Sequence, residues 1–415
     1  MIMFICDNFS SGLIGRKLGH SFSPQIHSYL ASYEYKLYEM EEDAVGEFLR
    51  SCPLDAFNVT IPYKKTVMPY LQHISEAAQR IGSVNTVVKR PDGLYGYNTD
   101  YYGFSYMVEK SGIEIKNKKV LILGSGGASL TVNAVISDMG AREIVIISRS
   151  GENNYGNIEK HRDADVIVNT TPVGMYPENG KAPVDLHIFK NLSGVLDLIY
   201  NPAQTKLLYD ANSLGIPSIN GLYMLSAQAK KACELFLGKS FQENPTDSIV
   251  KSIEEGLKNI VLVGMPGCGK STAGRLLSEK LERSFIDTDE IIIRNSDMPI
   301  PEIFSRFGED EFRKRETEAA KEAGKLSAAV IATGGGIITR EENYYPLHQN
   351  SVIVWLKRDT SLLPLDGRPV SQQNNINELY KKRAPLYERF SDVCVDVSEN
   401  PEETAERIIK AVRSI

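Results

Sequence analysis

The sequence predicts an α/β protein whose parallel sheets are flanked by helices, and two stretches support this prediction. Gly264–Thr272 matches the P-loop pattern G-x-x-x-x-G-K-[ST] at every fixed position. Gly124–Ser129 is a second glycine-rich stretch of a different kind. Each stretch follows a short β-branched run and precedes residues with helical spacing, which predicts a strand, a phosphate-binding loop and a helix. Two such units in a chain of 415 residues predict two or three domains.

The composition argues against several other classes of protein. The hydrophobic fraction of 42% and the charged fraction of 24% are ordinary for a soluble globular chain. A net charge of −6 does not indicate a general nucleic-acid surface. No apolar run approaches the roughly 18 residues of a membrane span. The five cysteines are far apart and form no C-x-x-C motif, which fits a reducing cytoplasm. We therefore expect a cytoplasmic protein with neither nucleic-acid nor membrane partners.

The first informative stretch is Ile14–Pro24, a loop rich in glycine and serine before a predicted helix over Gln25–Tyr33. Ser21 and Ser23 lie two positions apart, so both hydroxyls can point at one ligand. Helix capping is the alternative use of serine at such a place.

Polar side chains then follow several short predicted strands. Lys64 comes just past the strand Phe57–Ile61, where α/β proteins place ligand-binding groups. Ile81–Val88 and Gly96–Asp100 add Asn, Thr and Asp side chains at other strand ends. These groups suggest convergence on one cleft, although the same residue types also form ordinary turns.

The glycine-rich stretch of the first half has the pattern of a Rossmann unit. The strand Lys118–Leu123 runs into Gly124–Ser129 and a helix whose N-terminus suits a pyrophosphate. Ser129 departs from G-x-G-x-x-G at the third glycine position. The next strand, Glu143–Ile147, is followed by Arg149, where an NAD site usually carries an acid. A guanidinium suits a 2′-phosphate, so the expected cofactor is NADP.

Further strands are predicted over Asp165–Asn169 and Val195–Tyr200, and a helix over Leu222–Leu237. Together these stretches resemble shikimate dehydrogenase over about residues 10–240. The resemblance rests on seven motifs in the order of that family: Gly19–Pro24, Asn58–Lys64, Gly82–Thr86, Asn98–Asp100, Gly124–Ser129, Asn169–Met175 and Asn220–Gln228.

This resemblance implies a two-lobed dehydrogenase. Residues 1–102 and 218–240 would form a shikimate-binding lobe, and residues 103–217 a Rossmann-type NADP lobe. Lys64 and Asp100 would be the catalytic pair, because a lysine ammonium held by a carboxylate can protonate a developing alkoxide. The family also implies substrate contacts from Ser21, Ser23, Thr60, Asn85, Asp100, Tyr200 and Gln228. It implies cofactor contacts from Gly124, Ser125, Gly126, Gly127, Ala128, Ser129, Ser148, Arg149 and Gly221. Asn153 and Asn154 replace a second basic residue, so we expect modest discrimination against NAD.

The P-loop begins the second half, after a short and partly helical linker over residues 241–257. Asn259–Val263 is the predicted strand before the loop, and Lys270–Lys280 is the helix after it. The glycines let backbone N–H groups surround a phosphate. Lys270 would reach the β- and γ-phosphates of ATP, and the Ser271 hydroxyl would coordinate Mg²⁺.

Candidate catalytic carboxylates end the predicted strand Phe285–Asp289. With a P-loop present, Asp287 is expected to hold Mg²⁺ through water and Asp289 to accept a proton from a substrate hydroxyl. Without it, both would be surface aspartates. Arg313, Arg368 and Arg383 would form part of a binding site only if their side chains converge, because surface arginines are common. The remaining predicted elements are a helix over Ile303–Arg313, strands over Val330–Ala332 and Val352–Leu356, a triple-glycine turn at Gly334–Gly336, a lid over Leu365–Asn377 and a helix over Tyr380–Tyr387.

These motifs resemble shikimate kinase over about residues 258–413, and we assign 258–415 to a P-loop kinase domain. The family implies catalytic roles for Lys270 and Asp289, and metal contacts from Ser271 and Asp287. It implies substrate contacts from Asp289, Arg313, Gly335 and Arg383. It implies ATP contacts from Gly267, Cys268, Gly269, Lys270, Ser271, Thr272 and Arg368. Ser398–Asn400 departs from the family where a relative places an arginine against the adenine.

The two resemblances name successive steps of one pathway. We therefore predict a bifunctional enzyme that reduces 3-dehydroshikimate to shikimate with NADPH, and then phosphorylates shikimate with ATP and Mg²⁺. A regulator derived from these enzymes is the first alternative, and retention of residues such as Lys64, Asp100 and Lys270 argues against it. An NAD-dependent quinate dehydrogenase in the first half is the second. The sequence leaves the oligomeric state open.

Overall fold

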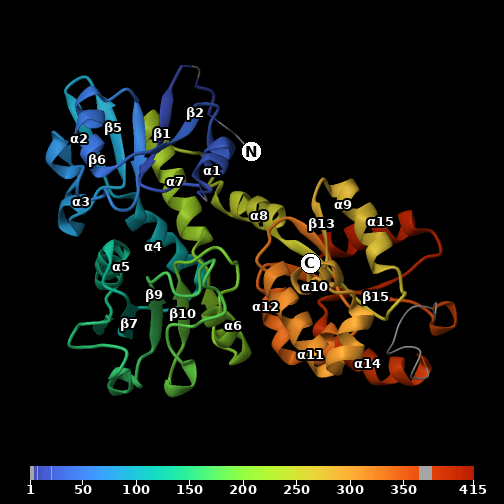
Figure 1. Ribbon diagram of the computed structural model, residues 1–415. Coiled ribbons are helices and arrows are strands. Elements are labelled where there is room, and N and C mark those ends of the chain that lie inside the picture. The colour runs from blue at the N-terminus through green and yellow to red at the C-terminus, as the bar shows by residue number, and fades with distance from the viewer. Residues whose placement is uncertain (1–3, 7, 20, 364–375) are drawn as a thin grey trace. The chain divides into compact units, whose positions relative to one another are not determined.

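The computed structural model describes residues 4–6, 8–19, 21–363 and 376–415. These residues form two compact units (Figure 1). The first unit comprises Met1–Gly174, Lys181–Tyr200 and Leu207–Ile253. The second unit comprises Met175–Gly180, Asn201–Lys206 and Glu254–Ile415.

A six-stranded sheet in the order β2-β1-β3-β5-β6-β4 begins the first unit. β1 pairs in parallel with β2 and β3, whereas β5 pairs antiparallel with β3 and β6. Ile14, Phe57 and Tyr63 are fully buried in the core of this lobe. The strands are β1 (Ser10–Gly15), β2 (Glu34–Glu39), β3 (Ala56–Val59), β4 (His73–Ile74), β5 (Thr86–Arg90) and β6 (Gly93–Tyr97), and the helices are α1 (Ser23–Leu30), α2 (Glu42–Ser51) and α3 (Glu76–Ile81).

Two long helices, α4 (Thr99–Ser111) and α7 (Leu222–Leu237), pack against each other in the first unit. Asn98 begins α4 as its cap, because its side chain accepts a hydrogen bond from the Tyr101 N–H. Gly103 permits the close contact, since a Cβ there would lie 2.5 Å from the Met224 carbonyl oxygen. Asp100 in the first turn of α4 and Gln228 on α7 are thereby held on rigid elements.

The second sheet of the first unit is parallel, in the order β11-β10-β9-β7-β8. Every residue of β7, β9 and β10 is buried, which explains their continuous apolar pattern. The predicted strand Val195–Tyr200 ends early, at Asp197, because the Asp197 carboxylate accepts the Ile199 N–H at 3.1 Å and turns the chain. The elements are β7 (Lys119–Leu123), α5 (Gly127–Asp138), β8 (Glu143–Ile147), β9 (Val166–Asn169), β10 (Gly194–Asp197), α6 (Lys206–Ser213) and β11 (Ser218–Ile219).

The predicted linker contains a regular helix, α8 (Thr246–Leu257). Ile249, Val250 and Ile253 form its buried face. Within the first unit, Asp247 accepts hydrogen bonds from Tyr106 Oη at 2.8 Å and from Lys110 Nζ at 2.5 Å. The helical part of the predicted segment is therefore a regular amphipathic helix that begins at Thr246.

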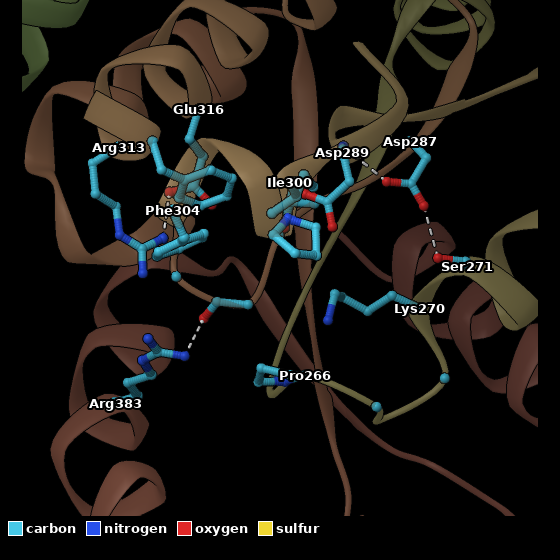
Figure 2. Close-up of a pocket in the computed structure, with 18 of the residues that line it drawn as sticks. Pro266, Lys270, Ser271, Asp287, Asp289, Ile300, Phe304, Arg313, Glu316 and Arg383 are labelled. Carbon is cyan, nitrogen blue, oxygen red and sulfur yellow. Dashed lines mark hydrogen bonds and ion pairs between the residues drawn. The ribbon is translucent and has the colours of Figure 1, made fainter. Parts of the chain in front are cut away.

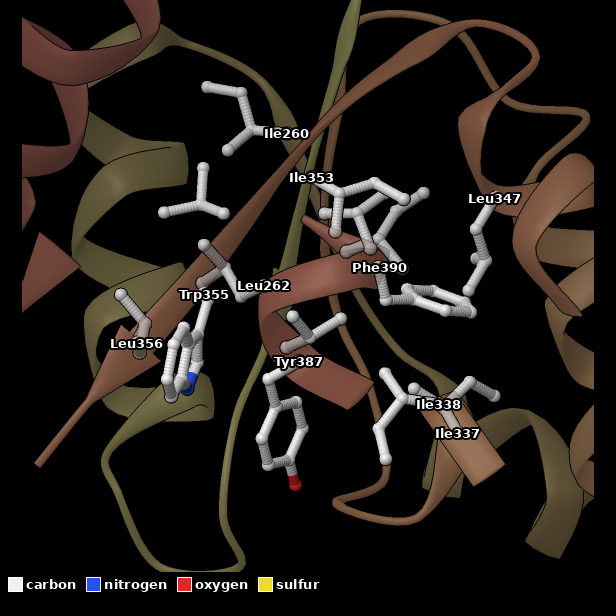
Figure 3. Packing of buried hydrophobic residues seen from close by; sticks show 14 of the residues in the cluster. Ile260, Leu262, Ile337, Ile338, Leu347, Ile353, Trp355, Leu356, Tyr387 and Phe390 are labelled. Atoms are coloured by element: carbon white, nitrogen blue, oxygen red, sulfur yellow. The ribbon is translucent and has the colours of Figure 1, made fainter. Parts of the chain in front are cut away.

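The second unit has a parallel sheet in the order β13-β14-β12-β15-β16, packed into one large core. Figure 3 shows part of that core, where Trp355 stacks on Tyr387 with ring centroids 5.8 Å apart. The strands are β12 (Asn259–Val263), β13 (Ser284–Asp287), β14 (Ala329–Ala332), β15 (Ser351–Lys357) and β16 (Val393–Asp396). The helices are α9 (Lys270–Leu281), α10 (Thr288–Ser296), α11 (Ile300–Ala323), α12 (Tyr344–His348), α14 (Ile376–Phe390) and α15 (Pro401–Arg413).

One predicted helix differs in the structure. The segment Ile303–Arg313 was expected to be continuous, but α11 is broken at Gly308, whose φ of 81° is the left-handed region that favours glycine. Short 3₁₀ turns occur at Met68–Tyr70, Ile158–His161, Leu186–Ile188, Ile337–Thr339, Glu341–Asn343 and Thr360–Leu362. Among the helices described, none has the length and apolar character needed to cross a membrane.

Candidate active sites

The first unit brings Lys64 and Asp100 together. Lys64 follows β3, and its Nζ donates to Asp100 Oδ2 at 2.6 Å. The side chains of Lys64 and Asp100 are 24% and 13% exposed, so the pair is shielded but still reachable from solvent. An ammonium held in this way can donate a proton to a bound substrate.

Polar residues around this pair form one hydrogen-bonded network. Asn85 Oδ1 accepts the Thr99 N–H at 2.7 Å, immediately before Asp100. The Thr99 hydroxyl bonds Gln228 Oε1 at 3.4 Å, so α7 joins the same network. The predicted substrate residues Asn85, Asp100 and Gln228 therefore come together, although they are far apart in the sequence.

The serine pair lies at the start of α1. Ser23 is the first helical residue and is buried, and its N–H donates to Ser21 Oγ at 3.3 Å. The N-cap of α1 is Phe22, which makes no side-chain cap bond, so Ser21 supplies the side-chain bond at the start of this helix. The ring of Tyr200 lies 5.4 Å from that of Phe22, and burial raises the pKa of Tyr200. A Cβ at Gly15 would lie 2.7 Å from Thr60 Cγ2, so Thr60 packs closely against the end of β1.

The glycine-rich loop after β7 has the features of a pyrophosphate cradle. Gly124 has a φ of 103°, and a Cβ there would lie 2.8 Å from Thr170 Oγ1. The loop ends at the N-terminus of α5, whose positive dipole end and free N–H groups suit an anion. Ser129 tolerates the third glycine position because its buried hydroxyl donates to the Gly126 carbonyl oxygen at 2.6 Å. These residues fit a dinucleotide.

Arg149 follows β8 and forms no ion pair with any residue that the structure describes. The Ser148 N–H donates to the Asn153 carbonyl oxygen at 3.1 Å, which closes this loop into a turn. Gly221 is the N-cap of α7, and a Cβ there would fall 2.0 Å from the Leu198 carbonyl oxygen. Whether Ser148, Arg149 and Gly221 contact a cofactor stays a prediction.

The second unit contains a cavity of about 590 Å³ between the P-loop and the triple-glycine turn. Figure 2 shows Lys270, Asp289, Arg313 and Arg383 around this cavity. Gly267, Gly269, Lys270, Ser271 and Thr272 line it, and Cys268 is fully buried beside them. Lys270 Nζ donates to the carbonyl oxygens of Gly264 and Met265 at 2.9 and 3.0 Å.

A hydroxyl and a carboxylate meet beside the P-loop. Ser271 Oγ donates to Asp287 Oδ2 at 2.8 Å, and Asp287 Oδ1 accepts the Asp289 N–H at 3.0 Å. Oxygen ligands of this kind are those that Mg²⁺ prefers, so the residues fit the predicted metal.

Two buried carboxylates face Gly334. A Cβ at Gly334 would lie 2.6 Å from Glu316 Oε1 and 3.1 Å from Asp289 Oδ1. Burial raises the pKa of Asp289 to about 6, and the charges of Asp287 and Glu316 add to the rise. Burial also raises the pKa of Glu316, against the effect of Arg313. Asp289 Oδ1 and Glu316 Oε1 have no hydrogen-bond partner among the residues described, so Asp289 can accept a substrate hydroxyl.

Two of the three predicted arginines, Arg313 and Arg383, line the same cavity. Arg313 donates to Glu316 at 2.7 Å and to Glu309 at 2.9 Å. Burial lowers the pKa of the Arg313 guanidinium, but these glutamates outweigh burial and hold that pKa above its ordinary value. Arg383 Nη1 donates to the Gly335 carbonyl oxygen at 3.1 Å, and both residues line the cavity. Arg368 and nearly all of the predicted lid lie outside the described residues.

The sequence interpretation missed several residues of these sites. Glu316 lies three positions after Arg313 on one helix, a spacing that could have indicated the ion pair. Arg358 follows β15 and lines the cavity, as a residue past a parallel strand often does. Phe304 and Phe312 also line the cavity, but apolar helical residues give no signal that separates a cavity wall from a core.

Taken together, the fold and the sites define a dinucleotide-dependent oxidoreductase joined to a P-loop phosphotransferase. Comparison with known proteins makes both classes specific. The chain belongs to the shikimate dehydrogenase family over its first 60%, and residues 266–413 match the family model for shikimate kinase. Residues 13–87 match the model for the shikimate dehydrogenase substrate binding domain.

Curated and solved relatives agree with this assignment. The NADP⁺-dependent shikimate dehydrogenase of Clostridium perfringens is 36% identical over 264 residues, which are 59% of this chain and 97% of the relative. A chorismate mutase/shikimate 5-dehydrogenase fusion protein from Clostridium acetobutylicum is 37% identical with a TM-score of 0.57, over 61% of this chain and 98% of that one. The Thermus thermophilus shikimate 5-dehydrogenase in complex with NADP(H) and shikimate is 27% identical with a TM-score of 0.53, over 60% and 99% of the two chains.

Proposed function

We propose that this chain catalyses two successive reactions of the shikimate pathway. The first unit reduces 3-dehydroshikimate to shikimate with NADPH, and the second phosphorylates shikimate with ATP. The observation that carries the proposal is that one chain holds both the Lys64–Asp100 pair and a P-loop cavity with converging arginines. A binding protein has no chemical need for both sets, so the regulator alternative is disfavoured.

In the first reaction, Lys64 is the proton donor. The substrate ketone becomes an alkoxide as it accepts hydride, and the Lys64 ammonium can protonate and stabilise that oxygen. Asp100 holds Lys64 by the 2.6 Å hydrogen bond and, with Asn85 and Gln228, provides polar contacts for the substrate hydroxyls. Ser21, Ser23, Thr60 and Tyr200 complete the proposed substrate contacts.

In the second reaction, Asp289 is the proposed proton acceptor. Its unpartnered Oδ1 can take the proton of the attacking substrate hydroxyl. Arg313 and Arg383 suit the substrate carboxylate, because guanidinium groups pair with carboxylates through two hydrogen bonds. Lys270 would stabilise the charge on the transferred phosphoryl group.

The cofactors follow from the residues that fit them. Gly124–Ser129, Ser148, Arg149 and Gly221 would hold NADP, which supplies the hydride when bound. Ser271 and Asp287 would hold Mg²⁺, which neutralises phosphate charge when bound. The P-loop Gly267–Thr272 and Arg368 would contact ATP.

The domain organisation and the cell compartment are also part of the proposal. The boundaries are 1–102 with 218–240 for the shikimate-binding lobe, 103–217 for the NADP lobe, 241–257 for the connection and 258–415 for the kinase. The widely separated cysteines and the absence of disulfides among the described residues support a cytoplasmic location.

An NAD-dependent quinate dehydrogenase stays the second candidate for the first unit. A quinate dehydrogenase from Corynebacterium glutamicum in complex with NAD is 25% identical, with a TM-score of 0.53. The shikimate dehydrogenase of Clostridium botulinum is 37% identical, which favours shikimate.

The test is one incubation of the purified chain with 3-dehydroshikimate, NADPH, ATP and Mg²⁺. NADPH is followed by absorbance and shikimate 3-phosphate by mass. We expect both signals, with NADPH oxidation lost in Lys64→Ala and phosphate product from added shikimate lost in Lys270→Ala. Each variant serves as the folding control for the other. Ligand binding without turnover in either unit would support the regulator, and faster turnover of quinate than of shikimate would support the second candidate.

A further inference from the structure

A buried hydrogen-bonded cluster adjoins the proposed substrate residues of the first unit. Tyr35 on β2 donates its hydroxyl to Asn58 Oδ1 at 2.8 Å. The Asn58 amide on β3 donates to the Asn85 carbonyl oxygen at 3.2 Å and to Thr86 Oγ1 at 3.0 Å. Asn58, Asn85 and Thr86 are all buried, so water does not compete for these bonds.

The cluster continues to the residue before the catalytic carboxylate. The Thr86 hydroxyl donates to Asn85 Oδ1 at 3.0 Å and bonds the Thr99 hydroxyl at 3.0 Å. Thr99 bonds Gln228 and directly precedes Asp100. A displacement of Asn58 would therefore be transmitted to the amide groups proposed to bind the substrate.

The Tyr35 ring packs against α1, the helix that begins with Ser23. Burial raises the pKa of Tyr35, and the Ser23 side chain opposes that rise. The Tyr35 ring stacks on His27 with centroids 4.0 Å apart and an interplanar angle of 12°. Burial lowers the pKa of His27 to about 3, so His27 is a neutral platform that holds the ring. The stacked ring thus holds the Tyr35 hydroxyl at Asn58 Oδ1.

We infer that Tyr35 is a positioning residue for the dehydrogenase reaction, because its hydroxyl holds Asn58, and Asn58 holds the Asn85–Thr86 network proposed to bind the substrate hydroxyls. This inference rests on the proposed function of the first unit. Tyr35 acts through Asn58, whereas the proposed proton transfer belongs to Lys64 and Asp100. Loss of the Tyr35 hydroxyl should therefore weaken substrate binding more than it slows the chemical step.

The experiment compares Tyr35→Phe with Tyr33→Phe in the full chain, with shikimate and NADP⁺ as substrates. Tyr33 is the control, because its hydroxyl bonds His27 Nδ1 at 2.6 Å and, among the described residues, neither Asn58 nor Ser23. For Tyr35→Phe we expect the KM for shikimate to rise about tenfold, with kcat within about twofold. The KM for NADP⁺ and the kinase rate should stay unchanged. A partly unfolded sample would lower the apparent kcat and leave KM alone, so the two effects are separable.

A second pair of variants keeps the inference testable if Tyr35→Phe does not fold. Thr86→Val removes the buried hydroxyl that accepts from Asn58, and Thr86→Ser keeps it. We expect a raised KM for shikimate in the first and a KM near wild type in the second. An unchanged KM in a folded Tyr35→Phe, or an equal rise in Tyr33→Phe, would overturn the inference. If Tyr35→Phe does not fold, an unchanged KM for shikimate in Thr86→Val would overturn the inference. A wild-type chain that does not oxidise shikimate would overturn the proposed function, and this inference with it.

Discussion

At the scale of single residues, Asp289 shows how a proposed proton acceptor can cost stability. The folded environment raises its pKa to about 6, from about 3.9 for an ordinary aspartate. Below about pH 4 the group is protonated in both the folded and unfolded states. Between about pH 4 and 6 only the folded state keeps the proton, and above about pH 6 both states are ionised. The buried carboxylate therefore destabilises the folded state increasingly as pH rises through this window.

Asp289→Asn should accordingly stabilise the protein and remove the kinase activity. At pH 7 we expect the free energy of unfolding of the second unit to increase by up to about 3 kcal/mol, and the gain to vanish near pH 4. In the wild type, the kinase kcat/KM should fall as pH drops through about 6. Denaturant melts at several pH values and a pH–rate profile measure both effects. A kinase kcat/KM that falls only near pH 4 would contradict this account. So would an Asp289→Asn variant that is less stable than the wild type at pH 7.

Arg149 carries a prediction about the cofactor. Since it forms no ion pair with any residue that the structure describes, its guanidinium is available for a 2′-phosphate. Arg149→Ala should raise the KM for NADP⁺ by about tenfold and leave the KM for NAD⁺ within about twofold. The kinase rate is the internal control. An unchanged preference between NADP⁺ and NAD⁺ would show that other groups select the cofactor.

At the scale of elements, glycines at loop–helix junctions set how closely the backbone approaches each site. A Cβ at Gly221, before α7, would fall 2.0 Å from the Leu198 carbonyl oxygen. A Cβ at Gly334, after β14, would meet the carboxylates of Glu316 and Asp289. Neither site can accept a methyl group without moving backbone or buried charge.

Adding a methyl group at each of these two glycines should reduce the activity of one unit and leave that of the other. Gly221→Ala should reduce dehydrogenase activity by at least about tenfold and leave the kinase near wild type, while Gly334→Ala should do the reverse. Gly256→Ala on α8 is the matched control, because a Cβ there meets nothing within 4 Å. That variant should keep both activities and gain about 0.5–1 kcal/mol of helix stability. Loss of both activities in either test variant would contradict this prediction, because it would mean that the substitution disturbs the folding of both units.

At the scale of the whole molecule, each unit has hydrophobic clusters of its own. The cluster around Ile260, Trp355 and Tyr387 is drawn entirely from the second unit. The clusters around Phe57, Leu121 and Phe104 are drawn entirely from the first. Because hydrophobic burial is the main source of folding free energy, separate cores favour separate unfolding.

Calorimetry of the full chain should therefore show two thermal transitions. NADP⁺ at about a hundred times its Kd should stabilise one unit by about 2.7 kcal/mol, which raises its Tm by roughly 5–10 °C. ADP with Mg²⁺ should move only the other transition. A single transition that shifts with either ligand would show that the units unfold together.

The sequence predicted the local units of the fold because their signals are local. The strands β8 and β12 and the helix α7 have the predicted bounds, since each is a continuous apolar or amphipathic run between clear breakers. The break at Gly308 was missed, because a glycine within a helical pattern is usually tolerated and only the surrounding packing decides its φ.

For the sites, the sequence by itself determined which chemical groups are present and in what order, through motifs such as Gly264–Thr272. Only the tertiary structure decided which of these groups meet. It brings Lys64 to within 2.6 Å of Asp100, and Tyr35 to within 2.8 Å of Asn58. It also places Glu316 and Asp289 at one glycine. The physical reason is that motifs record local backbone requirements, whereas distances across a site and the pKa of a buried carboxylate depend on strands and helices packed from distant parts of the chain.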